Sequence, residues 1–290
     1  MVKIHLKKGD ESQFLYETTV TAPVEEFLHD AVVIYNGRLK VDRICAEMEE
    51  LAKHGVTLPP NMQGLTEEQI EELKLRDEWG EKCQPSGGCV TNKDTIGRRN
   101  GQAPNEKMAE MLRKTIKEAK DMISKANVDN NKFVTQATVK EALDILRGAT
   151  MIVYPMGLPP HEPIKLECDN EEDLSGTQAS LEVIDPNAAA VWFSGKEMMP
   201  GKKLCDYIGK NEKTKIVAKL QKKGLGAPSR EPVVSQDQQK EMMAYYYKKQ
   251  EEMKKLEVET DDSYLDRPWA DGQQLKRQFQ GLNNIKWGPR

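Results

Sequence analysis

The chain begins with alternating apolar and polar residues, and the pattern then changes to helical spacing. Residues 2–7, VKIHLK, alternate with period two and predict a strand, and residues 12–20 predict a second strand after a turn at Gly9-Asp10. The residues on the helical stripe that follows, up to Asn36-Gly37, are Val24, Phe27, Leu28, Ala31 and Ile34. A hairpin followed by a helix is how a ubiquitin-like β-grasp domain begins, so the pattern favours that fold.

Two later apolar runs supply further strands in this interpretation. They are residues 151–155, MIVYP, and residues 164–168, IKLEC, on either side of a proline-rich loop. Because an isolated hairpin is only marginally stable, we expect both runs to join the first two strands in one sheet. The predicted fold class is α+β, with a small ubiquitin-like β-grasp sheet (1–36 plus 150–170) interrupted by a helical insertion (37–149).

The insertion carries the clearest helical patterns of the chain. Residues 105–126 place their apolar side chains on one face, and residues 38–54 and 137–147 each have one apolar stripe. Thr66 begins a TEEQ sequence with the spacing of a capping box. The short link between 105–126 and 137–147 predicts that these two helices pack as an antiparallel pair.

The C-terminal half is predicted to be mostly helical and charged. Asp185-Pro186 is expected to start a helix that contains Trp192 and Phe193. A lysine-rich helix is expected at 210–223, with Ile216, Val217 and Leu220 on its inner side. A long charged helix is expected at 235–259, either exposed or weakly partnered, because Lys249 interrupts its heptad pattern. The predicted parts are a charged helical region (171–260) and an extended tail (261–290).

Composition and charge narrow the function classes. The 290 residues are 38% hydrophobic and 31% charged, with a net charge of −4 and a pI near 5.8, which argues against a dedicated nucleic-acid binder. Charge is unevenly distributed: residues 67–81 hold seven acids and two bases, whereas residues 202–223 hold eight lysines. Such asymmetry is typical of partner recognition, although a solvated helix face explains any single charged run.

The cysteines and the apolar runs indicate an intracellular protein. The five cysteines are irregularly spaced, which fits reduced thiols better than a disulfide framework. The first residues lack the apolar core of a secretory signal, and no apolar run approaches the roughly 20 residues that a membrane-spanning helix needs. We therefore expect a soluble chain without membrane insertion.

Short motifs for catalysis, metals or nucleotides are all incomplete in this sequence. In the lysine-rich segment 209–232, Gly209-Lys210 is followed by Asn-Glu-Lys-Thr, which is not a P-loop. Residues 171–182 match ligand positions of an EF-hand, but Glu171 comes first, Gln178 takes the apolar position, and three prolines precede the loop, so a polar loop that caps a helix is favoured. No catalytic, metal or cofactor residue is predicted, and no small-molecule or nucleic-acid ligand is expected.

Several long and unusual segments resemble one protein family. They are YNGRLKV (35–41), LPPNMQGLTEEQIEELKLRDEWGEKC (58–83), GRRNGQAPNEKM (97–108), MIVYPMGLPP (151–160), EDLSGTQA (172–179), YIGKNEKTKI (207–216) and PWADGQQLKRQFQG (268–281). With these segments the chain resembles the Kurly-type cilia- and flagella-associated proteins over essentially its whole length. The resemblance implies a non-catalytic factor for motile cilia that acts in cytoplasmic assembly of axonemal dynein arms. It also implies links to planar polarity, ciliary orientation and basal bodies.

The lysine-rich segment is accordingly interpreted as a docking surface for an acidic protein partner. The candidate partner-contact residues are Lys213, Lys215, Lys219, Lys222, Lys223, Trp269, Phe279 and Trp287. The expected partners are dynein assembly factors, dynein chains or polarity proteins. For Trp269 and Trp287, packing onto their own domain is as compatible with the sequence as contact with a partner. The alternatives are a structural axonemal or basal-body protein and an enzyme with an unrecognised nucleotide site.

Overall fold

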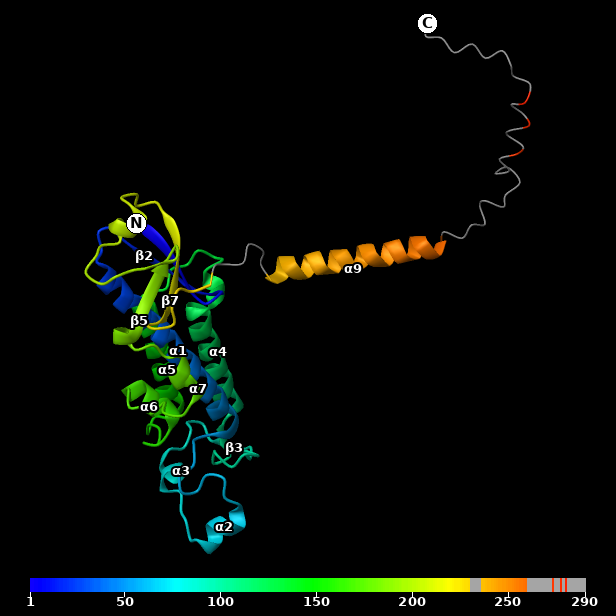
Figure 1. Ribbon diagram of the computed structural model, residues 1–290. Helices are drawn as coiled ribbons and strands as arrows, with labels where there is room; N and C mark the ends of the chain where they lie inside the picture. Colours follow the sequence, from blue (N-terminus) through cyan, green and yellow to red (C-terminus); the bar gives the residue numbers. More distant parts are fainter. Residues whose placement is uncertain (230–235, 260–272, 274–276, 278–279, 281–290) are drawn as a thin grey trace. The chain divides into compact units, whose positions relative to one another are not determined.

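The computed structural model describes residues 1–229, 236–259, 273, 277 and 280, and the chain forms two units, Met1–Arg230 and Glu231–Arg290 (Figure 1). The second unit contains one long helix, α9 (Gln236–Glu259). Trp269, Phe279 and Trp287 lie outside the described residues. The first unit holds the sheet and the remaining helices.

The main sheet has five strands and confirms the α+β class. They are β1 (Val2–Lys8), β2 (Glu11–Thr18), β5 (Ala189–Phe193), β6 (Lys196–Glu197) and β7 (Lys215–Lys222). Their spatial order is β2-β1-β7-β5-β6, with β1 and β7 parallel and the other neighbours antiparallel. The first and last strands are thus neighbours at the centre, which is the strand order of a β-grasp sheet.

The strands predicted at 151–155 and 164–168 are wrong, because both runs are helical. Residues 151–153 end α5 (Gln136–Val153), and residues 164–168 lie in α6 (Pro163–Asp169). The buried positions of α5 continue at helical spacing to the end of the run: Val139, Ala142, Leu146, Ala149, Thr150 and Val153. Val153 of MIVYP therefore extends the apolar face of a helix that begins 15 residues before this run, whereas Met151 and Ile152 are 59% and 60% exposed.

The helices predicted from Asp185 and at 210–223 are also wrong. Only Pro186–Ala188 forms a 3₁₀ turn, η2, and Trp192 and Phe193 belong to β5. Residues 215–222 are β7, in which Ile216, Ala218 and Leu220 are buried at every second position. This alternation is the signature of a half-buried strand, and β7 fills the central place between β1 and β5.

A single long helix, α1 (Val24–His54), crosses the sheet and continues beyond it. Asn36-Gly37 does not end this helix. A Cβ atom on Gly37 would come 2.6 Å from Cγ1 of Val139, so glycine is needed where α5 approaches α1 closely. The conformational cost of a mid-helix glycine is offset by this close packing.

The helices α4 (Glu106–Ile123) and α5 pack against each other and against α1. The end of α4 is followed by η1 (Lys125–Asn127), where Lys125 contacts Glu11 of β2, and α5 begins just after Val134 donates its N–H to Leu15 of β2. Both of these helix ends therefore lie beside the same hairpin, which confirms the antiparallel arrangement. One apolar core runs from the sheet through α1 to these two helices.

Residues 55–104 form an excursion between α1 and α4. Its elements are α2 (Glu67–Glu72), α3 (Glu78–Lys82) and the two-stranded ribbon β3 (Cys89–Thr91) and β4 (Gln102–Pro104). The predicted capping box at Thr66 is confirmed, because Thr66 Oγ1 accepts from Gln69 N and the Gln69 side chain accepts from Thr66 N. The short helices α7 (Gln178–Glu182) and α8 (Cys205–Ile208) complete the first unit.

Candidate interaction surfaces

Three of the five predicted docking lysines, Lys219, Lys222 and Lys223, have internal partners in the fold. Lys219 is 7% exposed, and its Nζ contacts Ser229 O at 2.9 Å and Asp10 Oδ1 at 3.3 Å. Lys222 and Lys223 donate from Nζ to the carbonyl oxygens of Leu181 (2.9 Å) and Asn187 (3.0 Å). These ammonium groups hold the second half of β7 to the β1–β2 turn, to Ser229, to α7 and to η2.

Lys213 and Lys215 are exposed and remain candidates for contact with a partner. Lys215 begins β7, and Lys213 lies in the turn before it, where its N–H donates to Asn211 Oδ1 at 3.1 Å. In the parallel register, Lys215 is the direct neighbour of Lys3 on β1. Lys3 was missed by the sequence analysis, although the alternation of VKIHLK already placed it opposite the apolar face.

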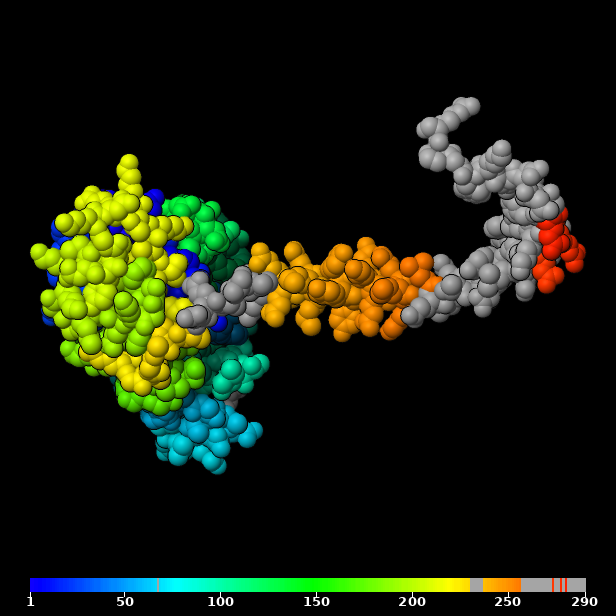
Figure 2. All heavy atoms as spheres, turned by 45° about the horizontal axis from the view of Figure 1, so that its top comes forward, coloured from blue at the N-terminus to red at the C-terminus, as the bar shows by residue number. Residues whose placement is uncertain are grey.

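Helix α9, drawn in orange in Figure 2, forms a second surface. Its large apolar side chains are 50% to 68% exposed. They are Met242, Met243, Tyr245, Tyr246, Tyr247, Met253 and Leu256. Methionine and tyrosine are the residue types enriched at the centres of protein interfaces. The sequence analysis predicted this helix correctly at 235–259 but did not select these side chains as candidates.

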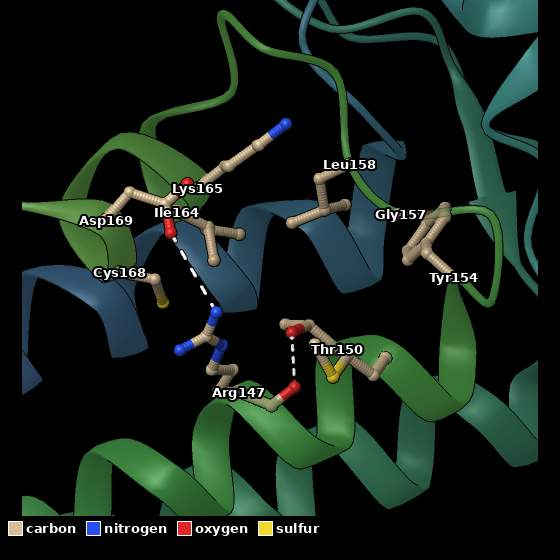
Figure 3. A pocket seen from close by; sticks show the side chains of 10 residues that line it. Arg147, Thr150, Tyr154, Gly157, Leu158, Ile164, Lys165, Cys168 and Asp169 are labelled. Atoms are coloured by element: carbon tan, nitrogen blue, oxygen red, sulfur yellow. Dashed lines mark hydrogen bonds and ion pairs between the residues drawn. The ribbon is translucent and has the colours of Figure 1, made fainter. Parts of the chain in front are cut away.

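A small cavity of about 150 Å³ lies between the end of α5 and α6 (Figure 3). Arg147 and Asp169 border it, with Nη2 and Oδ1 3.9 Å apart, and Thr150 Oγ1 donates to the Arg147 carbonyl at 2.8 Å. Burial raises the pKa of the Cys168 thiol in the same wall, which keeps the group protonated and a poor nucleophile. The cavity offers apolar walls and one ion pair, so it is better suited to packing than to covalent chemistry.

A larger groove of about 720 Å³ lies between the β1–β2 turn and α1, and internal contacts occupy most of its charged groups. The Lys125 ammonium lies 2.5 Å from Glu11 Oε1, and Lys8 Nζ donates to Tyr35 Oη at 2.6 Å. Arg38 Nε donates to the carbonyl oxygen of Ile123 at 2.9 Å. These contacts join the hairpin to the helices, which is a structural role.

Glu162 forms the most buried charged cluster in the described chain. Glu162 is fully buried, and its Oε2 accepts from both Thr57 N and Thr57 Oγ1 at 2.8 Å. Arg99 Nη1 lies 3.3 Å from Glu162 Oε1, and Arg99 Nη2 lies 2.7 Å from Glu47 Oε2. Because Arg99 and Thr57 belong to the excursion while Glu47 belongs to α1, the cluster fastens the excursion to the helical core.

No group of three or more histidine, cysteine or acidic side chains suited to a metal ion occurs within residues 1–229, 236–259, 273, 277 and 280. None of the helices in these ranges is both long and apolar enough to cross a membrane.

The accessibility of the thiols gives a direct test of the packing. We expect Cys89, which is exposed, to react first with a thiol reagent in the native full-length chain at pH 8. Cys45 is buried, and burial raises its pKa to about 12, so it should react only after denaturation. The measurement is the time course of the thiol reaction in the wild type and in the matched variant Cys89→Ser. A fast phase that persists in Cys89→Ser would contradict the arrangement.

Comparison with known proteins identifies the family. The model of the family described as cilia- and flagella-associated protein 298 matches residues 189–285, a span that contains both β7 and α9. The chain is 64% identical to the protein of that name from Danio rerio and 61% identical to that from Homo sapiens, in each case over 290 residues and the full length of both chains. It is 50% identical over 287 residues, 99% of each chain, to the one from Drosophila melanogaster.

No solved structure matches the chain. The identities confirm the resemblance inferred from the quoted segments, since they extend over the entire chain and not over the motifs alone. The protein belongs to the cilia- and flagella-associated protein 298 family.

Proposed function

We propose that this protein is a non-catalytic adaptor that acts in the cytoplasm during assembly of the dynein arms of motile cilia. It would hold dynein chains or other assembly factors, and contacts with polarity proteins near the basal body would link it to planar polarity and ciliary orientation. Membership of a cilia- and flagella-associated family supports a ciliary role. The observation that carries the adaptor role is the exposed apolar surface of α9.

Helix α9 has the properties of an element that docks onto a partner. Its 24 residues span about 36 Å at the usual rise per residue. Most helical stability in proteins comes from packing of an apolar face, yet the seven large apolar side chains of α9 are each at least half exposed. A partner surface that covers them would stabilise the helix and gain the burial of methionine and tyrosine anchors.

The spacing within α9 favours a partner different from itself. Met242, Tyr246, Lys249, Met253 and Leu256 follow one another at intervals of four, three, four and three residues and therefore share one stripe. A parallel, in-register pair of α9 helices would place Lys249 against Lys249 at the centre of the seam, and two like charges there repel. A partner helix with a carboxylate opposite Lys249 would instead gain an ion pair.

The test is recovery of dynein chains with the full-length protein from ciliating cells. The variant Met242→Gln/Met253→Gln/Leu256→Gln removes three anchors but keeps good helix formers. We expect it to recover at least about ten-fold less dynein chain or assembly factor than the wild type, as the loss of interface anchors predicts. Lys240→Gln/Glu251→Gln is the matched control, because it changes the opposite side of α9 with no change in net charge.

The outcomes separate the possible roles. Equal recovery by both variants would contradict the adaptor role of α9. Recovery of axonemal structural proteins alone, with the protein retained in salt-washed axonemes, would contradict cytoplasmic assembly and indicate a structural component. Stabilisation by a nucleotide would indicate an enzyme; a ligand at one hundred times its dissociation constant adds about 2.7 kcal/mol to the free energy of unfolding.

A further inference from the structure

The outer face of the main sheet carries a strip of side chains that the core does not use. Strands β1 and β7 are parallel, and their register pairs Lys3 with Lys215 and His5 with Val217. The inner neighbours Ile4, Ile216 and Ala218 belong to the apolar core, so the paired residues lie on the opposite face. Val217 is 37% exposed, whereas Ile216 and Ala218 are 5% and 0% exposed.

Two segments border this strip and limit its width. At one end, Lys219 Nζ donates to Ser229 O, and the Gln221 amide donates to Gly226 O, so residues 226–229 lie against that end of β7. On the side of β2, Phe133 forms a bridge with Leu15, and its ring centroid lies 5.2 Å from the Lys3 ammonium. His5 is half-buried, and its Nε2 lies 3.0 Å from Ser12 Oγ. We define Lys3, Lys215 and Val217 as the open strip.

The open strip concentrates positive charge around an apolar centre. Lys3 and Lys215 are cross-strand neighbours with like charge, an arrangement that destabilises a sheet. Lys213 adds a third exposed ammonium group in the turn before β7. Glu17 is the residue opposite Lys3 on β2, and Glu212 lies 3.7 Å from the amino terminus. Within the described ranges, neither Lys213 nor Lys215 forms an ion pair, so carboxylates from outside would offset the repulsion.

We propose that the open strip binds a short acidic segment of a partner protein. A carboxylate between Lys3 and Lys215 would relieve the repulsion between them, a second would meet Lys213, and an apolar side chain would cover Val217. Glu17 and Glu212 favour a protein segment over an anionic membrane, because a continuous layer of anionic headgroups would also face these two carboxylates. The inference rests on the proposed adaptor role and adds a second contact, on the sheet, that is independent of α9.

The experiment uses the full-length chain and a fluorescent 12-residue probe peptide rich in Asp and Glu with two leucines. A second probe carries Asn and Gln in place of the acids. The test variant is Lys3→Glu/Lys215→Glu, and the matched control is Lys117→Glu/Lys140→Glu, which reverses two exposed charges on α4 and α5. Circular dichroism and the melting temperature show that each variant is folded.

We expect the acidic probe to bind the wild type and the control within two-fold of each other. The test variant should bind it at least about ten-fold more weakly, because reversal of two cations turns attraction into repulsion. Affinity should also fall as salt rises, since these charges are exposed. The neutral probe should bind none of the proteins.

Site-specific cross-linking then locates the contact in cells. A photoactivatable residue at Val217 should form adducts with acidic peptides in ciliating cells, and these adducts should disappear in the Lys3→Glu/Lys215→Glu background. The same photoactivatable residue at Lys140 should not form them. Equal binding of the acidic probe by test and control variants would overturn the proposal, and so would binding to phosphatidylserine vesicles without binding to the probe.

The two proposals fail in different ways. Loss of partner recovery in the α9 variant together with unchanged binding by Lys3→Glu/Lys215→Glu would retain the adaptor role and remove the open strip from it. Unchanged partner recovery in the α9 variant would contradict the adaptor role of α9, whether or not the acidic probe binds to the open strip.

Discussion

Replacement of Glu162 by alanine is expected to lower the free energy of unfolding by about 3–5 kcal/mol, the usual cost of removing one partner of a buried ion pair. The Arg99 side chain is only 2% exposed; it would keep Glu47, 2.7 Å away, but lose the fully buried carboxylate 3.3 Å away. The N–H and the hydroxyl of Thr57 would lose their common acceptor. The measurement is the urea midpoint of the full-length chain followed by circular dichroism.

Two control variants test whether the loss of stability comes from the buried contacts of Glu162. Glu162→Gln keeps the side-chain length and one acceptor oxygen for Thr57, so its loss should be smaller than that of Glu162→Ala. Glu118→Ala changes an exposed glutamate on α4 and should stay within about 0.5 kcal/mol of the wild type. If Glu162→Ala were as stable as Glu118→Ala, the cluster would not fasten the excursion to the core.

Gly55→Ala is expected to destabilise the protein by about 2–6 kcal/mol, because backbone strain and steric overlap add to each other. Gly55 ends α1 with φ of 78° and ψ of −161°, a conformation that only glycine adopts readily. An added Cβ atom would overlap the carbonyl oxygen of Gln102 and come 2.6 Å from Asn100 Oδ1. Because Arg99 Nη1 donates to the Gly55 carbonyl at 2.6 Å, a shift of this backbone would also disturb the buried cluster.

Gly148→Ala is the matched control for Gly55→Ala. Gly148 lies within α5, and a Cβ atom added there would meet nothing within 4 Å. This substitution should stabilise the protein by about 0.5–1 kcal/mol through helix propensity alone. Thermal denaturation of both variants checks the pair, and a loss of stability in Gly148→Ala equal to that in Gly55→Ala would contradict the local explanation.

The candidate surfaces were only partly predictable from the sequence. The sequence identifies the lysine-rich segment but predicts a helix there, because Ile216, Val217 and Leu220 also fit helical spacing. In the strand that forms instead, Lys219 contacts Asp10 and Ser229, and Lys222 and Lys223 donate to backbone carbonyls of α7 and η2. Lys3 becomes a neighbour of Lys215 although 212 residues separate them in the sequence. No local pattern could indicate that pair.

The sequence alone determined the elements that local spacing specifies. Residues 2–7 alternate with period two, α4 and α9 follow their predicted ranges closely, and the Thr66 capping box is a contact between residues three positions apart. The family was also determined by the sequence, since long unusual segments identify relatives without any structure.

Only the tertiary structure decided which segments complete the sheet and which lysines stay free. Residues 151–155 and 215–222 are both short and contain β-branched apolar residues, and short runs of this kind are compatible with either helix or strand. Val153 of the first run continues the buried face of α5, whereas the second run fits the central place between β1 and β5, where both of its edges are paired. Packing partners far away in the sequence therefore determine that the first run is helical and the second is a strand, because burial of a shared apolar face outweighs weak local propensity.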